Sequence, residues 1–321
     1  MGCGGDEGAL SQGLAAKGVG ETEELAGWGC LVPTARRGRR VSRGGVPGRV
    51  GDGRGPVGYT PAVTAFAGRY GPWALVTGAA QGVGLAFSEA LLARGCSVVL
   101  VDQLPSVVDV AADLAGETRA VVADLADATW LDQVVAATAD LEIGLAVANA
   151  AVSFVGRFLD QSAASRLATV QVNCLATTEL AAWVLPAMVS RGRGGFIVTS
   201  SGSALAGTAG VASYSASKAF GLNLAEALGW ELRESGVDVK AVVAPAMDTP
   251  GWRSHAVEEA NMFQPAADPR AVVEAALDHL PEPGWFLADP SLEFVAGMER
   301  NERVEVLSRA TTALYPTEYR R

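Results

Sequence analysis

Residues 73–84 read WALVTGAAQGVG, and this stretch decides the fold. An apolar run leads into a turn that carries three glycines, Gly78, Gly82 and Gly84. Gly78 permits a tight exit from a strand, Gly82 lets the backbone approach a pyrophosphate, and Gly84 lets the next helix pack closely on a sheet. The amino end of that helix offers unpaired N–H groups and a positive dipole end to phosphates. We therefore predict a dinucleotide-binding turn made by Gly78, Gln81, Gly82, Val83 and Gly84.

Similar apolar runs recur along the chain and alternate with longer Ala/Leu-rich segments. We predict strands at 73–77, 97–101, 119–123, 143–149, 195–200, 237–243 and 285–288, and helices at 83–94, 127–139, 163–191, 213–235 and 268–280. The strands are continuous rather than alternating apolar runs, which is typical of a parallel sheet buried on both faces. Strands that alternate with helices indicate right-handed crossovers. The predicted fold class is therefore α/β, a single-domain doubly wound parallel sheet (Rossmann fold).

The two ends of the chain differ from this body. Residues 1–58 are rich in Gly and Arg with weak apolar periodicity, which predicts a flexible N-terminal extension before a domain at 59–321. A C-terminal helix is expected at about 291–314. The extension suggests a nucleic-acid-binding arm, but aromatic residues do not interleave its arginines and the whole chain carries a net charge of −10. We therefore expect no nucleic-acid partner.

Composition narrows the class of protein further. The chain has 321 residues, of which 49% are apolar, enough for one large core. Four cysteines without metal-type spacing and only two histidines predict no metal site. The sequence has no uninterrupted apolar run of about 18 residues, and its start lacks the apolar core of a secretory signal. We expect a soluble cytoplasmic protein with no membrane partner.

An acidic residue ends the second predicted strand, in Val101-Asp102. A carboxylate there can accept hydrogen bonds from the adenosine ribose hydroxyls and repels a 2′-phosphate. Gln81 and Gln103 supply no positive charge for such a phosphate. The sequence therefore predicts NAD in preference to NADP, although a solvated carboxylate at a strand end is the alternative reading of Asp102.

The candidate catalytic residues lie downstream of this turn. Tyr214 and Lys218 are four residues apart at the start of a predicted helix, so they share one face. A nearby ammonium favours the phenolate, which brings a tyrosine closer to general acid–base work at neutral pH. Ser201 ends the fifth strand, at the sheet edge where ligands bind, and can position a substrate carbonyl. Asn173 falls in the middle of a helix, where an amide needs a backbone or water partner.

Together these residues resemble the short-chain dehydrogenase/reductase family over about residues 70–250. The resemblance rests on the glycine turn, Asp102, Asp124-Leu125, Asn149-Ala150-Ala151, Asn173, Ser201, Tyr214 and Lys218. Finer features, such as Tyr70-Gly71-Pro72-Trp73, resemble the branch of 3-ketoacyl-CoA reductases and 17β-hydroxysteroid dehydrogenases.

The resemblance implies an oxidoreductase that transfers a hydride between NAD(H) and a small-molecule secondary alcohol or ketone. Tyr214 exchanges the alcohol proton, Lys218 binds the nicotinamide ribose, Ser201 holds the substrate oxygen and Asn173 holds a water. Asp124 lies by the adenine and Asn149 by the adenosine ribose. The further cofactor contacts that it implies are Leu125, Ala150, Pro245 and Thr249. The family is usually a homodimer or homotetramer through its long helices.

Some features depart from the family pattern or leave alternatives open. Ala246 stands where a glycine is usual, so an added methyl could crowd the nicotinamide carboxamide. A substrate lid is expected at about 250–266, and its apolar residues favour a hydrophobic substrate, although they could equally pack the loop down. Two other functions remain on the same fold: a redox-neutral epimerase or cyclase, and a non-catalytic dinucleotide-binding regulator.

Overall fold

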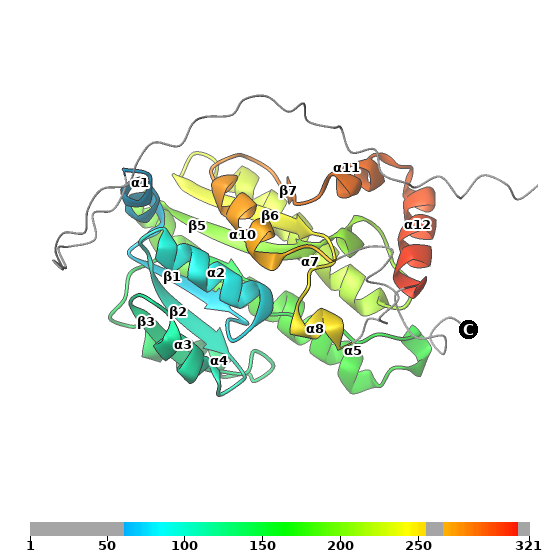
Figure 1. The fold of residues 1–321 in the computed structure, drawn as a ribbon, viewed down its shortest axis with the longest axis horizontal. Coiled ribbons are helices and arrows are strands. Elements are labelled where there is room, and N and C mark those ends of the chain that lie inside the picture. Colours follow the sequence, from blue (N-terminus) through cyan, green and yellow to red (C-terminus); the bar gives the residue numbers. More distant parts are fainter. Residues whose placement is uncertain (1–60, 255–265, 314–321) are drawn as a thin grey trace, which may run out of the picture. The chain divides into compact units, whose positions relative to one another are not determined.

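A computed structural model describes residues 61–254 and 266–313, and Figure 1 shows their arrangement. They lie within one compact unit, Pro56–Arg321, and contain a seven-stranded sheet of order β3-β2-β1-β4-β5-β6-β7 in which every pair is parallel. The strands are β1 Trp73–Thr77, β2 Ser97–Asp102, β3 Thr118–Val122, β4 Ile143–Ala148, β5 Gly194–Ser201, β6 Val237–Ala244 and β7 Phe286–Leu287. The predicted doubly wound α/β fold is confirmed. The predicted extension 1–58 lies outside the described residues.

Helices cover both faces of the sheet, which explains the continuous apolar strands. One apolar core lies under α1 Pro61–Tyr70, α2 Gly82–Ala93, α3 Val107–Asp113 and α10 Pro269–Asp278. The other lies under α4 Trp130–Ala137, α6 Ala176–Arg191, α7 Ala212–Glu231 and α11 Pro290–Gly297. Successive residues of β5 alternate between the two cores, since Phe196 and Val198 belong to one and Ile197 to the other. Each central strand therefore contributes side chains to both cores.

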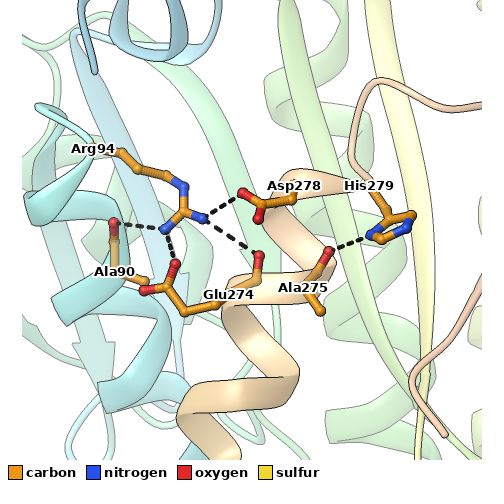
Figure 2. Close-up of polar contacts among 6 residues, drawn as sticks. All are labelled: Ala90, Arg94, Glu274, Ala275, Asp278 and His279. Atoms are coloured by element: carbon orange, nitrogen blue, oxygen red, sulfur yellow. Dashed lines mark hydrogen bonds and ion pairs between the residues drawn. The ribbon is translucent and has the colours of Figure 1, made fainter. Parts of the chain in front are cut away.

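Helices α2 and α10 are joined by Arg94, which follows the last residue of α2 (Figure 2). Its guanidinium contacts the Glu274 carboxylate at 2.5 Å and the Asp278 carboxylate at 2.7 Å. It also donates to the carbonyls of Ala90 and Glu274 at 3.5 and 3.4 Å. A side chain that bonds a carbonyl at the carboxyl end of one helix and carboxylates on another holds these two helices together.

The predicted helix at 163–191 is continuous but not uniform. It consists of α5 Ala163–Val170, a π-helical turn η2 Gln171–Leu175, and α6. This helix is long and apolar enough to span a membrane by length and composition alone, yet half of its most apolar window is buried against the rest of the protein. Its α6 part packs on one of the two cores of the sheet.

The C-terminal prediction was wrong in one respect. The single helix expected at 291–314 is two helices, α11 and α12 Arg300–Ala313, separated by Met298, which has an extended backbone. The Arg303 guanidinium bridges the corner by donating to the carbonyls of Ala296 and Met298 at 2.7 and 2.8 Å. It also donates to the Leu205 carbonyl at 3.0 Å, so α12 is attached to the segment that follows Ser201.

Five further helical elements of the described residues were not predicted: α1, α3, the short α8 Pro250–Arg253, and the 3-10 turns η1 Phe158–Asp160 and η3 Gly202–Leu205. Helix α8 begins at Thr249, whose hydroxyl accepts from the Trp252 amide at 3.2 Å. The predicted lid at 250–266 is described only at its two ends, since 255–265 lie outside the described residues. The segments on either side of the predicted lid are linked, because the Ala267 amide donates to the Ala246 carbonyl at 2.9 Å.

Candidate active site

The glycine turn between β1 and α2 has the backbone geometry that its sequence predicts. Gly78 and Gly82 adopt φ values of +67° and +59°, which side chains disfavour. A Cβ at Gly84 would lie 2.0 Å from the Gly78 carbonyl oxygen. The turn therefore presents bare backbone to the amino end of α2, which is the cradle that a pyrophosphate needs. Gln81 is exposed at this end, and Val83 is partly buried.

Asp102 is held against the turn rather than directed freely into solvent. Its side chain is 7% exposed, and Oδ2 accepts from the Ala80 amide at 2.9 Å while Oδ1 accepts from the Leu104 amide at 2.9 Å. Each carboxylate oxygen has a second lone pair, so a ribose hydroxyl can still donate to it. The solvated carboxylate considered above does not describe this residue, because Asp102 fixes the turn as well as carrying charge there.

Asn149 joins the end of β4 to the same turn. Its Nδ2 donates to the carbonyls of Thr77 and Gly78 at 2.9 and 3.3 Å. Thr77 completes the link, since its hydroxyl accepts from the amides of Asn149 and Ala150 at 3.0 and 3.1 Å. Asn149 therefore shapes the dinucleotide turn. Thr77 does so as well, and the sequence analysis gave it no role.

Lys218 connects Tyr214 to β5, the strand that ends at Ser201. The Ser201 hydroxyl lies 2.9 Å from that of Ser203 and remains partly exposed. The Lys218 ammonium lies 5.6 Å from the centre of the Tyr214 ring and donates to the Thr199 carbonyl at 2.8 Å. A tyrosine with a cation beside its ring is an arrangement suited to proton exchange with a substrate oxygen.

Asn173 lies in the π-helical turn η2 and is almost fully buried. Its amide exchanges two hydrogen bonds with the backbone of Val152, with Oδ1 accepting at 2.9 Å and Nδ2 donating at 3.0 Å. Nδ2 also donates to the Ser217 hydroxyl at 2.9 Å, which itself donates to the Tyr214 carbonyl at 2.8 Å. The Asn173 side chain thus positions the start of α7, and Ser217 is a positioning residue that the sequence analysis missed. The run of small residues between Tyr214 and Lys218 could have pointed to it.

The ammonium of Lys218 is buried, and burial lowers the pKa of this lysine from 10.5 to about 8. The unfolded chain binds a proton that the folded chain releases between these two values, so the wild type should gain stability as pH rises through this window. Across this window, the unfolding free energy of the wild type should rise by ~3 kcal/mol relative to that of Lys218→Met, since each unit of pKa shift is worth ~1.4 kcal/mol.

Urea unfolding of wild type and Lys218→Met at a series of pH values measures this gain. The difference in unfolding free energy between the two proteins cancels the titrating groups that do not interact with Lys218, and carrying Cys174→Ser in both proteins removes the thiol that does. A difference that stays constant between pH 8 and 10.5 would mean that the amine titrates normally.

The other predicted contacts lie farther along the same edge. Asp124 is exposed after β3, where its Oδ1 accepts from the Ala126 amide at 2.9 Å, and Leu125 is buried. Pro245 and Thr249 follow β6, and a Cβ at Gly82 would lie 3.3 Å from the Thr249 side chain. Thr249 therefore lies directly over the turn. Ala246 is exposed, and its carbonyl is bonded to Ala267.

Within the part of the chain that the structure describes, no cluster of three or more His, Cys, Asp or Glu side chains could hold a metal ion. The site is instead a phosphate-type turn at one end and a Tyr–Lys–Ser group at the other, along the carboxyl edge of a parallel sheet. This combination is typical of nicotinamide-dinucleotide oxidoreductases on a Rossmann fold.

Comparison with known proteins identifies the family. The short chain dehydrogenase family model matches residues 72–260, and the chain belongs to the short-chain dehydrogenase/reductase family. It is 32% identical to "Inactive hydroxysteroid dehydrogenase-like protein 1" of Pongo abelii over 58% of this chain and 60% of the relative. It is also 32% identical to the very-long-chain 3-oxoacyl-CoA reductase of Homo sapiens, over 54% of this chain and 58% of the relative. The chain thus spans less than two thirds of the length of these relatives.

Solved structures agree with this assignment. A structure of 7beta-hydroxysteroid dehydrogenase superposes with a TM-score of 0.69 at 25% identity, over 75% of this chain and 98% of that chain. A short-chain dehydrogenase from Sphingobium yanoikuyae, solved in complex with NADPH, superposes with a TM-score of 0.62 at 28% identity, over 76% of this chain and 94% of that chain. The family therefore binds nicotinamide dinucleotides.

Proposed function

We propose that this protein is an NAD(H)-dependent oxidoreductase acting on a secondary alcohol or ketone, with Tyr214 as general acid and base. The observation that carries the proposal is the group at the end of β5, where the buried Lys218 ammonium lies beside the Tyr214 ring. A bound nicotinamide supplies or accepts the hydride. In the reductive direction Tyr214 gives its proton to the substrate oxygen, Ser201 donates a hydrogen bond to that oxygen, and Lys218 stabilises the phenolate that remains.

The proposal can be tested by following reduced-nicotinamide absorbance with a panel of hydrophobic secondary alcohols and ketones. Turnover of at least one such compound, linked to a stoichiometric change in NADH, supports it. The two rival functions give different results. A regulator binds NADH and turns nothing over, which is a serious alternative because a similar protein is named inactive. An epimerase or cyclase forms product without net change in NADH.

We further propose that NAD is preferred to NADP because of Asp102. Its carboxylate lies at the end of β2 beside the turn, where a 2′-phosphate would meet like charge, and exposed Gln103 offers no cation. NADH should bind at least ~10-fold more tightly than NADPH, an advantage equivalent to ~1.4 kcal/mol. Fluorescence titration gives both Kd values.

Gln103→Arg is the informative variant for this preference, since it adds a cation without disturbing the bonds from Asp102 to the turn. It should narrow the preference by tightening NADPH binding while NADH binding changes little. Equal affinity of the wild type for NADH and NADPH would show that Asp102 does not determine the cofactor preference.

We also propose that the chain forms a homodimer or homotetramer through its long helices. Large apolar side chains are exposed on them, with Leu167 at 68% on α5 and Trp230 at 71% on α7. Exposed apolar faces on adjacent helices are suited to burial against a second copy. A cytoplasmic location is part of the same proposal, supported by free Cys96 and Cys174.

A further inference from the structure

Thr199, on β5, is the exception among the buried threonines of the described residues. Its hydroxyl has no hydrogen-bond partner there, although its side chain is only 7% exposed. The other five bond through their hydroxyls to carbonyl oxygens: Thr77 to Val147, Thr138 to Val134, Thr169 to Ser165, Thr177 to Asn173, and Thr208 to Ala206. A buried hydroxyl without a partner costs stability that a valine of the same shape would not, so it calls for a functional explanation.

The position of Thr199 along β5 places it beneath the candidate active site. Alternate residues of a strand face the same side, so Ile197, Thr199 and Ser201 point to one face of the sheet. Ile197 is fully buried and Ser201 is partly exposed at the strand end. Thr199 lies between them, where the apolar core ends and the site begins.

The register across the sheet gives the same placement. Thr199 pairs with Val242 of β6, and Val198 pairs with Ala148, the last residue of β4. Asn149 follows Ala148 directly in the chain. Asn149 is bonded to Gly78 of the dinucleotide turn, and the Thr199 carbonyl holds the Lys218 ammonium. Thr199 is therefore flanked by the turn on one side and by the Tyr–Lys pair on the other.

We propose that the Thr199 hydroxyl hydrogen-bonds the carboxamide of a bound nicotinamide and so fixes the orientation of its ring. This inference rests on the proposed function. The carboxamide is the one polar substituent of the nicotinamide ring. Two neighbours of Thr199 on this face, Ile197 on β5 and Val242 on β6, are apolar, and the third, Ser201, lies at the strand end. A hydroxyl can donate to the carboxamide oxygen or accept from its nitrogen. Thr199 is a cofactor-positioning residue whose hydroxyl is satisfied when the dinucleotide binds.

Thr199→Val tests this without a need for turnover. The variant keeps the shape of the side chain, so the free protein should be as stable as the wild type or more stable in thermal unfolding. NADH should bind about 2- to 12-fold more weakly, the range expected for the loss of one neutral hydrogen bond. ADP-ribose, which lacks nicotinamide, should bind equally to both proteins. Thr199→Ser should restore most of the NADH affinity.

Thr138→Val is the matched control, because the same atoms change at a buried threonine at the end of α4 that donates to the Val134 carbonyl at 2.7 Å. It should lower thermal stability and leave NADH affinity unchanged. The inference is overturned if Thr199→Val leaves NADH affinity unchanged, or weakens NADH and ADP-ribose equally. Wild-type protein that binds ADP-ribose but not NADH contradicts both this inference and the proposed function. Binding of NADH without turnover contradicts only the proposed function.

Discussion

Tyr214→Phe should reduce turnover by ~10³-fold or more while NADH affinity changes by less than ~3-fold. The substitution removes only the phenolic oxygen, which exchanges the proton with the substrate, and general acid–base groups contribute ~10²- to 10⁴-fold. The aromatic ring beside the Lys218 ammonium stays in place. Steady-state kinetics on whichever substrate the panel identifies, with NADH titration alongside, measures both quantities.

Tyr70→Phe provides the control for this experiment, since it removes the same oxygen at the opposite edge of the sheet. The Tyr70 hydroxyl donates to the Asp238 carboxylate at 2.6 Å, near the start of β6. Its loss should lower stability by ~1–2 kcal/mol and leave turnover unchanged. Undiminished turnover in Tyr214→Phe would exclude this tyrosine as the acid–base group.

Gly84→Ala should cost ~3 kcal/mol or more in unfolding free energy and should weaken NADH binding by at least ~100-fold. The new methyl would lie 2.0 Å from the Gly78 carbonyl oxygen and 2.8 Å from Asn149 Nδ2. Backbone cannot yield as a flexible side chain does, so overpacking here reaches or exceeds the usual 1–3 kcal/mol range. The turn must open, and this displaces the amides at the amino end of α2.

Gly297→Ala introduces the same methyl at an exposed glycine, at the end of α11, with no atom within 4 Å of the new Cβ. Alanine is the better helix former, so its stability should stay within ~1 kcal/mol of the wild type or rise. Urea unfolding and NADH titration distinguish the two variants. Wild-type NADH affinity in Gly84→Ala would show that the turn does not hold the dinucleotide.

The strands were predictable because burial on both faces leaves a clear pattern. β1 matches its predicted bounds, since a fully apolar run is followed at once by the turn glycines. Helix α3 was missed because it is short and only Val107 and Ala111 are buried, too few to create a periodicity. The break between α11 and α12 was also not predictable, since no proline marks it and the carbonyls of Ala296 and Met298 accept from Arg303 of the next helix.

The candidate site was predictable by residue type but not by contact. Tyr214 and Lys218 could be identified because their spacing of four residues places them on one face of a predicted helix. The partner of Asn173 could not be foreseen, because Ser217 is 44 residues away and adjacent only after α7 folds beside η2. Thr199 carries no sequence signal either, since a threonine in a strand is ordinary until its hydroxyl is found without a partner.

The attachment of Arg303 to Leu205 also affects the order of folding. These residues are 98 positions apart, and the bond joins α12 to the segment between Ser201 and Tyr214. The Ala209 amide, in the same segment, donates to Ser308 at 3.0 Å. Contacts this distant form late, after the loop-closure entropy has been overcome. During synthesis, the sheet and the dinucleotide turn can therefore form first. The segment between Ser201 and Tyr214 reaches its final position only after α12 has left the ribosome and packed against it.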